Sequence, residues 1–276
     1  MCNASITTNN LTIGYAGINT PSLEGRAGER FVVQSDLSFS LNEGEMVCML
    51  GPNGCGKSTL LRTLAGLQPP LGGEYSLSGE AGLSSISVNG LSAKRSKHIA
   101  LVLTERMSLD NTTVHDVVAM GRYPYTSFLG GLTEADEQII AEALEQVGFK
   151  HLSGANPAPE PLRRSFFNSH SDGEKQRILI AKALAQQTPV ILLDEPTAHL
   201  DLPHRILILR LLRRLAHEQG KTVLISTHEL ELALALSDRV MLMTPGKGVV
   251  LDTAEALKKT DAFTRAFGMD IFHPLD

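Results

Sequence analysis

One stretch of nine residues, 51–59, carries the clearest chemical pattern in the sequence. It fits the phosphate-loop pattern G-x-x-x-x-G-K-[ST], and its residues are Gly51, Pro52, Asn53, Gly54, Cys55, Gly56, Lys57, Ser58 and Thr59. Glycines let successive backbone N–H groups turn toward one anion, and a helix N-terminus adds positive potential. Lys57 can reach the terminal phosphates of a nucleotide, and the Ser58 hydroxyl can hold Mg²⁺. The stretch therefore predicts a nucleotide phosphate site, with an ordinary glycine-rich strand–helix turn as the alternative.

Two further segments end in side chains that a hydrolytic site needs. An apolar run over residues 190–193 ends in Asp194 and Glu195, and the next apolar run is followed by His228. In open parallel sheets, ligands bind outside the carboxyl ends of the strands. There Asp194 can hold Mg²⁺, Glu195 can act as general base on a water, and His228 can contact the γ-phosphate and that water. Each segment alone also fits solvated surface groups, but after a phosphate loop they indicate phosphoryl chemistry.

A second anion site is predicted at residues 171–176. Ser171, Gly173 and a helix N-terminus supply hydroxyl and backbone donors, and Ser171 with Glu174 forms a capping-box pattern. The alternative is a plain helix cap. Two phosphate sites so far apart in one chain raise the question whether the second serves a nucleotide held by another copy.

The elements that must position these groups predict an α/β fold with a mainly parallel sheet. Strand-like patterns over residues 11–15 and 37–41 predict an antiparallel β layer ahead of the nucleotide core, with an exposed loop at 19–30 between them. After a loose stretch from 68 to 97, strands alternate with helices, which indicates parallel pairing. We expect one domain over residues 1–276, with its core at about 1–105 and 188–276. A helical subdomain at about 106–187 is inserted in that core, and prolines at 157–161 mark a linker in it.

Composition narrows the class of protein. The chain has 276 residues and a formal net charge of −5, which is unfavourable for a general nucleic-acid binder. No run of about 18 apolar residues and no signal-peptide pattern occurs, so we expect a cytoplasmic protein. The three cysteines lack metal-ligand spacing. One of them, Cys55, lies in the phosphate loop, where the helix N-terminus predicts a lowered thiol pKa; the alternative is that Cys55 is only a small residue that fits there.

Taken together, these motifs resemble the ABC-type ATPase family over nearly the whole chain. The phosphate loop, a signature motif at 170–174, a Walker B segment at 190–195, a D-loop at 198–201 and a switch histidine at 228 follow the family's order. The resemblance implies that ATP and Mg²⁺ are bound, that Tyr15 stacks on adenine and that Asp201 belongs to the D-loop. It also implies that the signature residues contact the ATP of a partner chain; these are Ser171, Asp172, Gly173 and Glu174.

The sequence departs from the family pattern at two places. The usual signature motif is Leu-Ser-Gly-Gly-Gln, whereas this chain has His170, Asp172 and Glu174 in place of the leucine, first glycine and glutamine. Glu105 stands where the family has its Q-loop glutamine, so it is the third expected Mg²⁺ ligand beside Ser58 and Asp194.

A closer resemblance is to the ATPase subunits of importers for iron–siderophore complexes, haem and vitamin B12. It rests on residues 117–125, which include a Gly-Arg-x-Pro-aromatic segment, and on residues 132–136. It implies a homodimer in the ATP-bound state, an integral membrane permease as partner, an indirect link to a substrate-binding protein, and a place on the inner face of the cell membrane. The alternatives are the ATPase subunit of an ABC exporter and a non-transport ABC protein.

Overall fold

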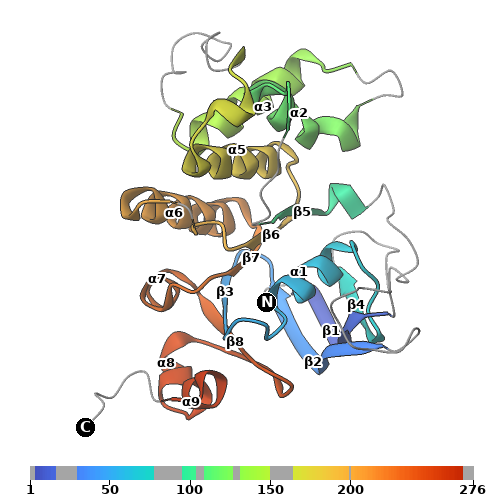
Figure 1. Cartoon of the computed structure of the whole chain (residues 1–276), viewed down its shortest axis with the longest axis vertical. Helices are drawn as coiled ribbons and strands as arrows, with labels where there is room; N and C mark the ends of the chain where they lie inside the picture. The colour runs from blue at the N-terminus through green and yellow to red at the C-terminus, as the bar shows by residue number, and fades with distance from the viewer. Residues whose placement is uncertain are drawn as a thin grey trace.

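The computed structural model describes residues 4–16, 30–77, 95–103, 109–126, 131–149, 164–198 and 200–269 (Figure 1). Three sequence predictions fall outside these ranges: nearly all of the loop at 19–30, the linker at 157–161, and Glu105. His199 of the predicted D-loop is outside them as well.

The predicted mainly parallel sheet is confirmed. Its strand order is β5-β6-β7-β3-β8-β9, and every neighbouring pair is parallel except β8 with β9. The strands are β3 (Met46–Leu50), β5 (Ile99–Val102), β6 (Val190–Asp194), β7 (Thr222–Ser226), β8 (Arg239–Thr244) and β9 (Gly248–Asp252). Because β6, β7 and β3 are adjacent and parallel, their carboxyl ends meet at one edge.

The antiparallel layer is also confirmed, with three strands in the order β2-β1-β4 within the described residues. They are β1 (Ala4–Tyr15), β2 (Phe31–Asn42) and β4 (Gly72–Leu77). The prediction of a loose stretch through residues 72–77 was wrong, because β4 pairs with β1 and buries Tyr75 and Leu77. β1 and β2 are longer than predicted, since register shifts around Asn10, which has a positive φ, interrupt the alternating pattern.

The helices lie on both sides of the central sheet. Those of the core are α1 (Lys57–Ala65), α6 (Leu202–Gln219), α7 (Leu230–Leu236), α8 (Ala254–Lys258) and α9 (Ala262–Phe267). A second group sits at one end of the molecule in Figure 1: α2 (Val114–Ala119), α3 (Glu134–Gln146) and α5 (Asp172–Ala185). Short 3-10 turns are η1 (Arg95–Lys97), η2 (Met120–Tyr125) and η3 (Phe167–Ser169). α3 and α5 each begin with a capping box, at Thr133 with Asp136 and at Ser171 with Glu174, and the second confirms the pattern predicted from the sequence.

The inner strands β6, β7, β3 and β8 of the central sheet are buried on both faces, as their continuous apolar sequences require, and the edge strand β9 is partly exposed. Along β3, Met46, Cys48 and Leu50 join the core beneath α5 and α6, whereas Val47 and Met49 join the core shared with α1 and the antiparallel sheet. The phosphate-loop strand is therefore held between two separate apolar cores.

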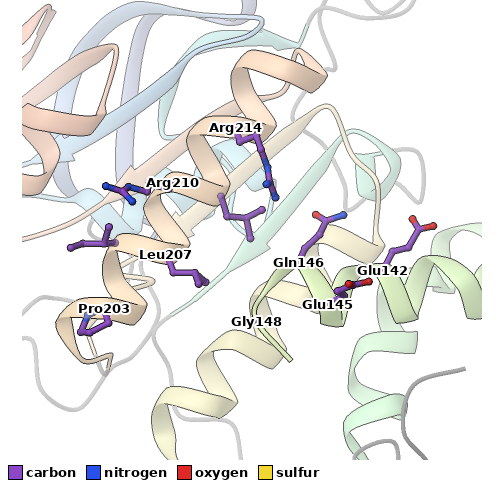
Figure 2. A pocket seen from close by; sticks show the side chains of 10 residues that line it. Glu142, Glu145, Gln146, Gly148, Pro203, Leu207, Arg210 and Arg214 are labelled. Atoms are coloured by element: carbon purple, nitrogen blue, oxygen red, sulfur yellow. The ribbon is translucent and has the colours of Figure 1, made fainter. Parts of the chain in front are cut away.

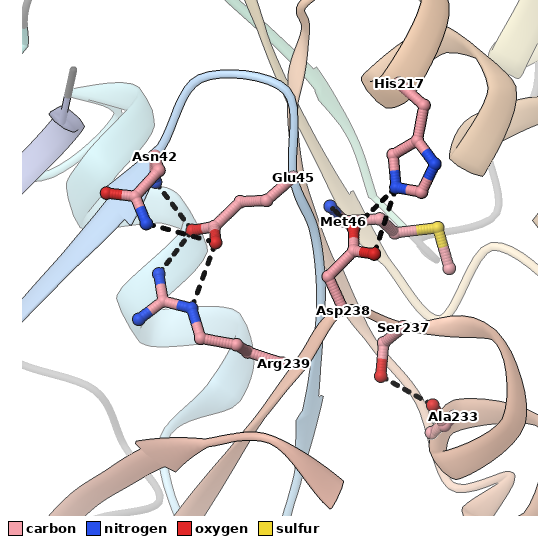
Figure 3. A network of polar contacts seen from close by, with 8 residues as sticks. All are labelled: Asn42, Glu45, Met46, His217, Ala233, Ser237, Asp238 and Arg239. Carbon is pink, nitrogen blue, oxygen red and sulfur yellow. Dashed lines mark hydrogen bonds and ion pairs between the residues drawn. The ribbon is translucent and has the colours of Figure 1, made fainter. Parts of the chain in front are cut away.

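A polar network fixes the opposite, amino-terminal edge of this strand (Figure 3). The carboxylate of Glu45 accepts hydrogen bonds from the guanidinium of Arg239 and from the backbone N–H of Asn42. The backbone N–H of Met46 donates to Asp238 (2.8 Å), which also contacts His217 at 2.9 Å. The start of β3 is thereby tied to the start of β8, which leaves the far end of β3 free to lead into the loop.

Arg122 joins the members of the second helical group to one another. Its Nε donates to Asp136 of α3 (2.7 Å), and its Nη1 donates to the carbonyl oxygen of Ala185 at the end of α5 (2.8 Å). Both charged side chains are buried. At Gly121 an added Cβ would lie 2.3 Å from the carbonyl oxygen of Lys182, so only glycine permits this close packing of η2 on α5. The Gly-Arg part of residues 117–125 thus packs inside the protein, and Tyr123 is the member most exposed, at 61%.

Candidate active site

The phosphate loop follows β3 directly and turns into α1, as the sequence predicts. Gly54 and Gly56 have φ angles of +78° and +106°, which disfavour other residues. Gly56 is the N-cap of α1, and no side chain caps that helix. The first turn of α1 also contains no acidic residue. No capping side chain and no acidic residue of the first turn therefore competes for the N–H groups at the start of α1, and the loop fits a bound phosphate.

Lys57 and Ser58 lie at the mouth of this loop. The Lys57 ammonium donates to the carbonyl oxygens of Gly51 (2.7 Å) and Pro52 (3.2 Å), so it is held over the loop. The Ser58 residue is exposed in the first turn of α1. These positions suit a cation that contacts terminal phosphates and a hydroxyl that contacts Mg²⁺.

The acidic pair at the end of β6 is organised by Ser226 of the neighbouring strand β7. The Ser226 hydroxyl donates to Oδ1 of Asp194 (2.6 Å) and accepts from the backbone N–H of Glu195 (2.9 Å). Glu195 has a φ of +45°, a left-handed conformation that costs a non-glycine residue on the order of 1–3 kcal/mol. Strain of this kind is common at functional sites because the surroundings hold the residue in place. Here the hydroxyl and the carbonyl oxygen of Ser226 both accept from the backbone N–H of Glu195 and hold that conformation.

His228 lies beside Glu195, as the sequence predicts. Its Nε2 is 2.6 Å from Oε1 of Glu195, and both side chains are partly exposed. Thr227, the residue before His228, is bonded to β3, the strand that leads into the phosphate loop: its N–H donates to the carbonyl oxygen of Met49 (3.1 Å). The ends of β3, β6 and β7 therefore bring the loop, the acidic pair and the histidine to one edge.

Tyr15 ends β1 next to the first turn of α1. Its hydroxyl is 3.1 Å from Oγ1 of Thr59, and 41% of the residue is exposed. An exposed aromatic ring beside the phosphate loop has the geometry that base stacking needs.

The signature residues form the start of α5 and bond to one another. The N–H and hydroxyl of Ser171 donate to Oε2 of Glu174, at 3.0 and 2.8 Å. These bonds, with the nearby His170, lower the pKa of the Glu174 carboxyl. His170 also contacts the Ser165 hydroxyl at 2.8 Å. A carboxylate therefore occupies the serine donors that the sequence analysis assigns to a phosphate.

Asp201 is the N-cap of α6. Its carboxylate accepts from the backbone N–H of His204 (3.2 Å) and pairs with the imidazole of the same residue, which lowers the pKa of Asp201. The Asp201 side chain is exposed, so it can also meet another chain.

One sequence prediction at the loop was wrong. Cys55 is 1% exposed, and its side chain packs into the core shared by α1 and the antiparallel sheet. Burial raises the pKa of its thiol, and the nearby Lys57 offsets only part of that effect. The expected lowered pKa fails because burial in apolar surroundings outweighs the opposing effects of the Lys57 ammonium and of the backbone N–H groups of Lys57 and Cys55.

Three groups near this edge escaped the sequence analysis: Ser226, Gln34 and Glu229. Ser226 offered a signal, since it is a polar residue inside an otherwise apolar strand. Glu229 accepts from Thr197 (2.9 Å) and pairs with Arg205 (3.3 Å), which links the turn after β7 to the segment before α6. Gln34 sits in β2, far from the loop in sequence, and no local pattern marks it.

A separate hollow of about 750 Å³ lies between α3 and α6 (Figure 2). α3 contributes Glu142 and Glu145 to its lining, and α6 contributes Arg210 and Arg214. None of the predicted site residues lines it. Elsewhere one apolar cluster joins the second helical group to α6 and the central sheet.

Comparison with known proteins gives the class. The ABC transporter family profile matches residues 34–198. The iron(3+)-hydroxamate import ATP-binding protein FhuC of Bacillus subtilis is 35% identical over 267 residues, which are 96% of this chain and 88% of that protein. The cobalamin import ATP-binding protein BtuD of Halobacterium salinarum is 36% identical over 222 residues, covering 80% of this chain and 51% of that protein. The dimeric ATP-binding cassette MJ0796, solved with ADP and phosphate, superposes with a TM-score of 0.71 at 25% identity, covering 90% of this chain and 98% of that one.

The fold and these matches define an ATP-binding cassette. The chain belongs to the ABC transporter family and is an ATP hydrolase. Within the described ranges, every helix is too short or too polar to span a bilayer.

Proposed function

We propose that this ATPase drives a membrane permease that imports an iron–siderophore complex or vitamin B12, and that hydrolysis occurs at the edge formed by β3, β6 and β7. The convergence of Lys57, Glu195 and His228 at that edge carries the assignment of the site. The cargo class rests on relatives named for hydroxamate and cobalamin import. Import of haem remains a prediction from the sequence.

Phosphate binding is the first task of these residues. The N–H groups of the loop and of the start of α1 donate hydrogen bonds to the β- and γ-phosphate oxygens. The Lys57 ammonium leaves its carbonyl partners in the loop and contacts the same phosphate oxygens. Tyr15 stacks on the adenine ring, and Thr59 holds the tyrosine hydroxyl. Mg²⁺, held by Ser58, Asp194 and Glu105, would offset phosphate charge.

Water activation is the second task. Glu195 accepts a proton from the attacking water as general base, because its carboxylate lies at the open strand edge. His228 holds that carboxylate and can reach the γ-phosphate. Ser226 positions the whole turn through its two hydrogen bonds.

A second copy completes the site. The signature segment at the start of α5 and Asp201 at the start of α6 meet the nucleotide of the partner, in a head-to-tail homodimer. The dimeric relative bound to ADP and phosphate supports this arrangement. We assign residues of about 106–187 to a helical subdomain distinct from the core at about 1–105 and 188–276, which the packing of α2, α3 and α5 on one another at one end of the molecule supports.

Co-purification with permease subunits, followed by ATPase assays, tests the proposal. Turnover should depend on Lys57, so Lys57→Ala should abolish it, and the permease with a cargo-loaded binding protein should stimulate it. Ferric hydroxamate and cobalamin are the cargoes to compare. Stimulation by neither would overturn the cargo class, and turnover by Lys57→Ala equal to the native rate would overturn the site.

A further inference from the structure

Gln34 of β2 connects the phosphate loop to a distant hairpin. Its side-chain Nε2 donates to the carbonyl oxygen of Cys55 in the loop (2.9 Å) and to that of Thr244 at the end of β8 (2.8 Å). Its Oε1 accepts from the backbone N–H of Gly248 at the start of β9 (3.1 Å). The residue is 1% exposed. One buried amide therefore uses both of its donors and its acceptor to join three segments that are far apart in sequence.

The bond to Cys55 has a direct consequence for phosphate binding. In a trans peptide the carbonyl and the following N–H point in opposite directions. Since the Cys55 carbonyl is held toward Gln34, the N–H of Gly56 is directed to the other side of the loop. In the proposed phosphate site, that side faces the bound anion.

The back of the loop is packed tightly around this bond. An added Cβ at Gly56 would lie 2.7 Å from Cγ1 of Val33, and one at Gly51 would lie 2.5 Å from the carbonyl oxygen of Met243. β2 and the end of β8 therefore pack against the back of the loop. Gln34 of β2 is the polar side chain that bonds both to the loop and to the end of β8.

We propose that Gln34 is a positioning residue for the phosphate loop, and that its amide sets the affinity for ATP by fixing the orientation of the Cys55–Gly56 peptide. This inference rests on the proposed phosphate site. It assigns a nucleotide-binding role to a residue of the antiparallel sheet that does not itself touch the nucleotide.

Two variants of nearly equal shape test the role. Gln34→Leu removes the donors and the acceptor, and Gln34→Glu keeps an acceptor for Gly248 but sets a carboxylate against two carbonyl oxygens. Thr8→Val is the matched control, because it removes two buried hydrogen bonds to Phe39 in the same sheet without touching the loop. Gln34→Glu keeps the test informative if Gln34→Leu does not fold.

The first measurement separates KM from kcat. Both Gln34 variants should raise KM for ATP about tenfold or more with kcat within about threefold, since a ground-state contact has been loosened. Thr8→Val should lower the melting temperature and leave KM unchanged. A native KM in both Gln34 variants, with a lowered melting temperature, would reduce Gln34 to a structural residue and overturn the proposal.

The second measurement uses the nucleotide-free protein. Modification of Cys55 by N-ethylmaleimide, followed by peptide mass spectrometry in a Cys2→Ser background, should be at least fivefold faster in the Gln34 variants and unchanged in Thr8→Val. Equal rates in all proteins would overturn the proposal. Lys57→Ala is assayed alongside: if it hydrolyses ATP at the native rate, the proposed phosphate site is wrong, whereas the thiol result still decides whether Gln34 holds the loop.

Discussion

Oε1 of Glu195 and Nε2 of His228 lie 2.6 Å apart, although the two residues come from the ends of different strands. The contact aligns the carboxylate that is expected to take a proton from water. Ser226 holds the acidic pair in place, because its hydroxyl accepts from the N–H of Glu195 and donates to the carboxylate of Asp194. The general base is thereby fixed by Ser226 at the end of β7 and by His228 just after that strand.

Glu195→Gln should bind ATP but lose hydrolysis, because an amide keeps the shape of the side chain and cannot accept the proton. The variant should collect as an ATP-bound dimer in size-exclusion chromatography with ATP and Mg²⁺. Loss of general-base catalysis typically costs about 10²- to 10⁴-fold in rate. Hydrolysis at the native rate would contradict the assignment of Glu195.

Glu174→Gln should favour the ATP-bound dimer. The Glu174 carboxylate holds the N–H and hydroxyl of Ser171, the donors that a phosphate of the partner's nucleotide would use. A neutral amide keeps the helix cap but removes the competing negative charge. In a Glu195→Gln background, we expect the ATP concentration for half-maximal dimer to fall about fivefold, equivalent to about 1 kcal/mol.

Glu142→Gln is the matched control for that experiment, because it removes one exposed carboxylate on α3 away from the signature segment. Its dimerisation should match that of the background protein. An unchanged dimerisation midpoint in Glu174→Gln would mean that the capping box does not compete with the nucleotide.

Tyr15→Ala should weaken ATP binding by roughly 5- to 150-fold, because stacking of an aromatic ring on a base is worth about 1–3 kcal/mol. Tyr15→Phe keeps the ring but loses the bond to Thr59, so we expect a loss of about threefold at most. Titration with a fluorescent ATP analogue measures both. Equal losses in the two variants would assign the effect to the hydroxyl and away from stacking.

Most residues of the proposed ATP site could be predicted from patterns within short segments of the sequence. The loop, the strand before it and the acidic pair each lie within a short segment whose periodicity and glycine spacing are readable. β4 was missed because Gly72 and Gly73 suggest a turn. Gly73 is needed inside the strand, since an added Cβ there would lie 2.1 Å from the carbonyl oxygen of Asn10. Gln34 could not be found because its partners are as many as 214 positions away, and only the assembled sheets bring them together.

Glu105→Gln should shift the Mg²⁺ dependence of hydrolysis while keeping the rate within about tenfold, roughly 1.4 kcal/mol of barrier. Glu105 lies outside the described residues, so this prediction rests on the sequence. A carboxylate is a harder Mg²⁺ ligand than an amide, but Asp194 and the phosphates already crowd the site with negative charge. Glu105→Ala should cost more than Glu105→Gln. Superimposable Mg²⁺ titrations for the three proteins would make Glu105 a bystander.

Asp136→Asn should lower stability in a pH-dependent way. The carboxylate accepts from the N–H and hydroxyl of Thr133, at 2.9 and 2.7 Å, and from Arg122 at 2.7 Å. The Thr133 bonds chiefly, with Arg122, lower the pKa of Asp136 to about 2. Since removing one member of a buried pair costs about 3 kcal/mol or more, the melting temperature at pH 7 should fall by roughly 6–12 °C.

The sign of the pH effect follows from the lowered pKa of folded Asp136. In the unfolded chain an aspartate titrates near pH 3.9, so between about pH 4 and 2 the unfolded state binds more protons than the folded state. The stabilisation is complete above about pH 4 and is lost as the pH falls toward 2. Melting temperatures measured from pH 7 to pH 3 should therefore show a gap between native protein and Asp136→Asn that is constant at neutral pH and narrows below pH 4. Glu142→Gln, on the same helix, should show no such gap, and a gap of constant size down to pH 3 would mean that the ionised carboxylate is not what stabilises the Arg122–Asp136 contact.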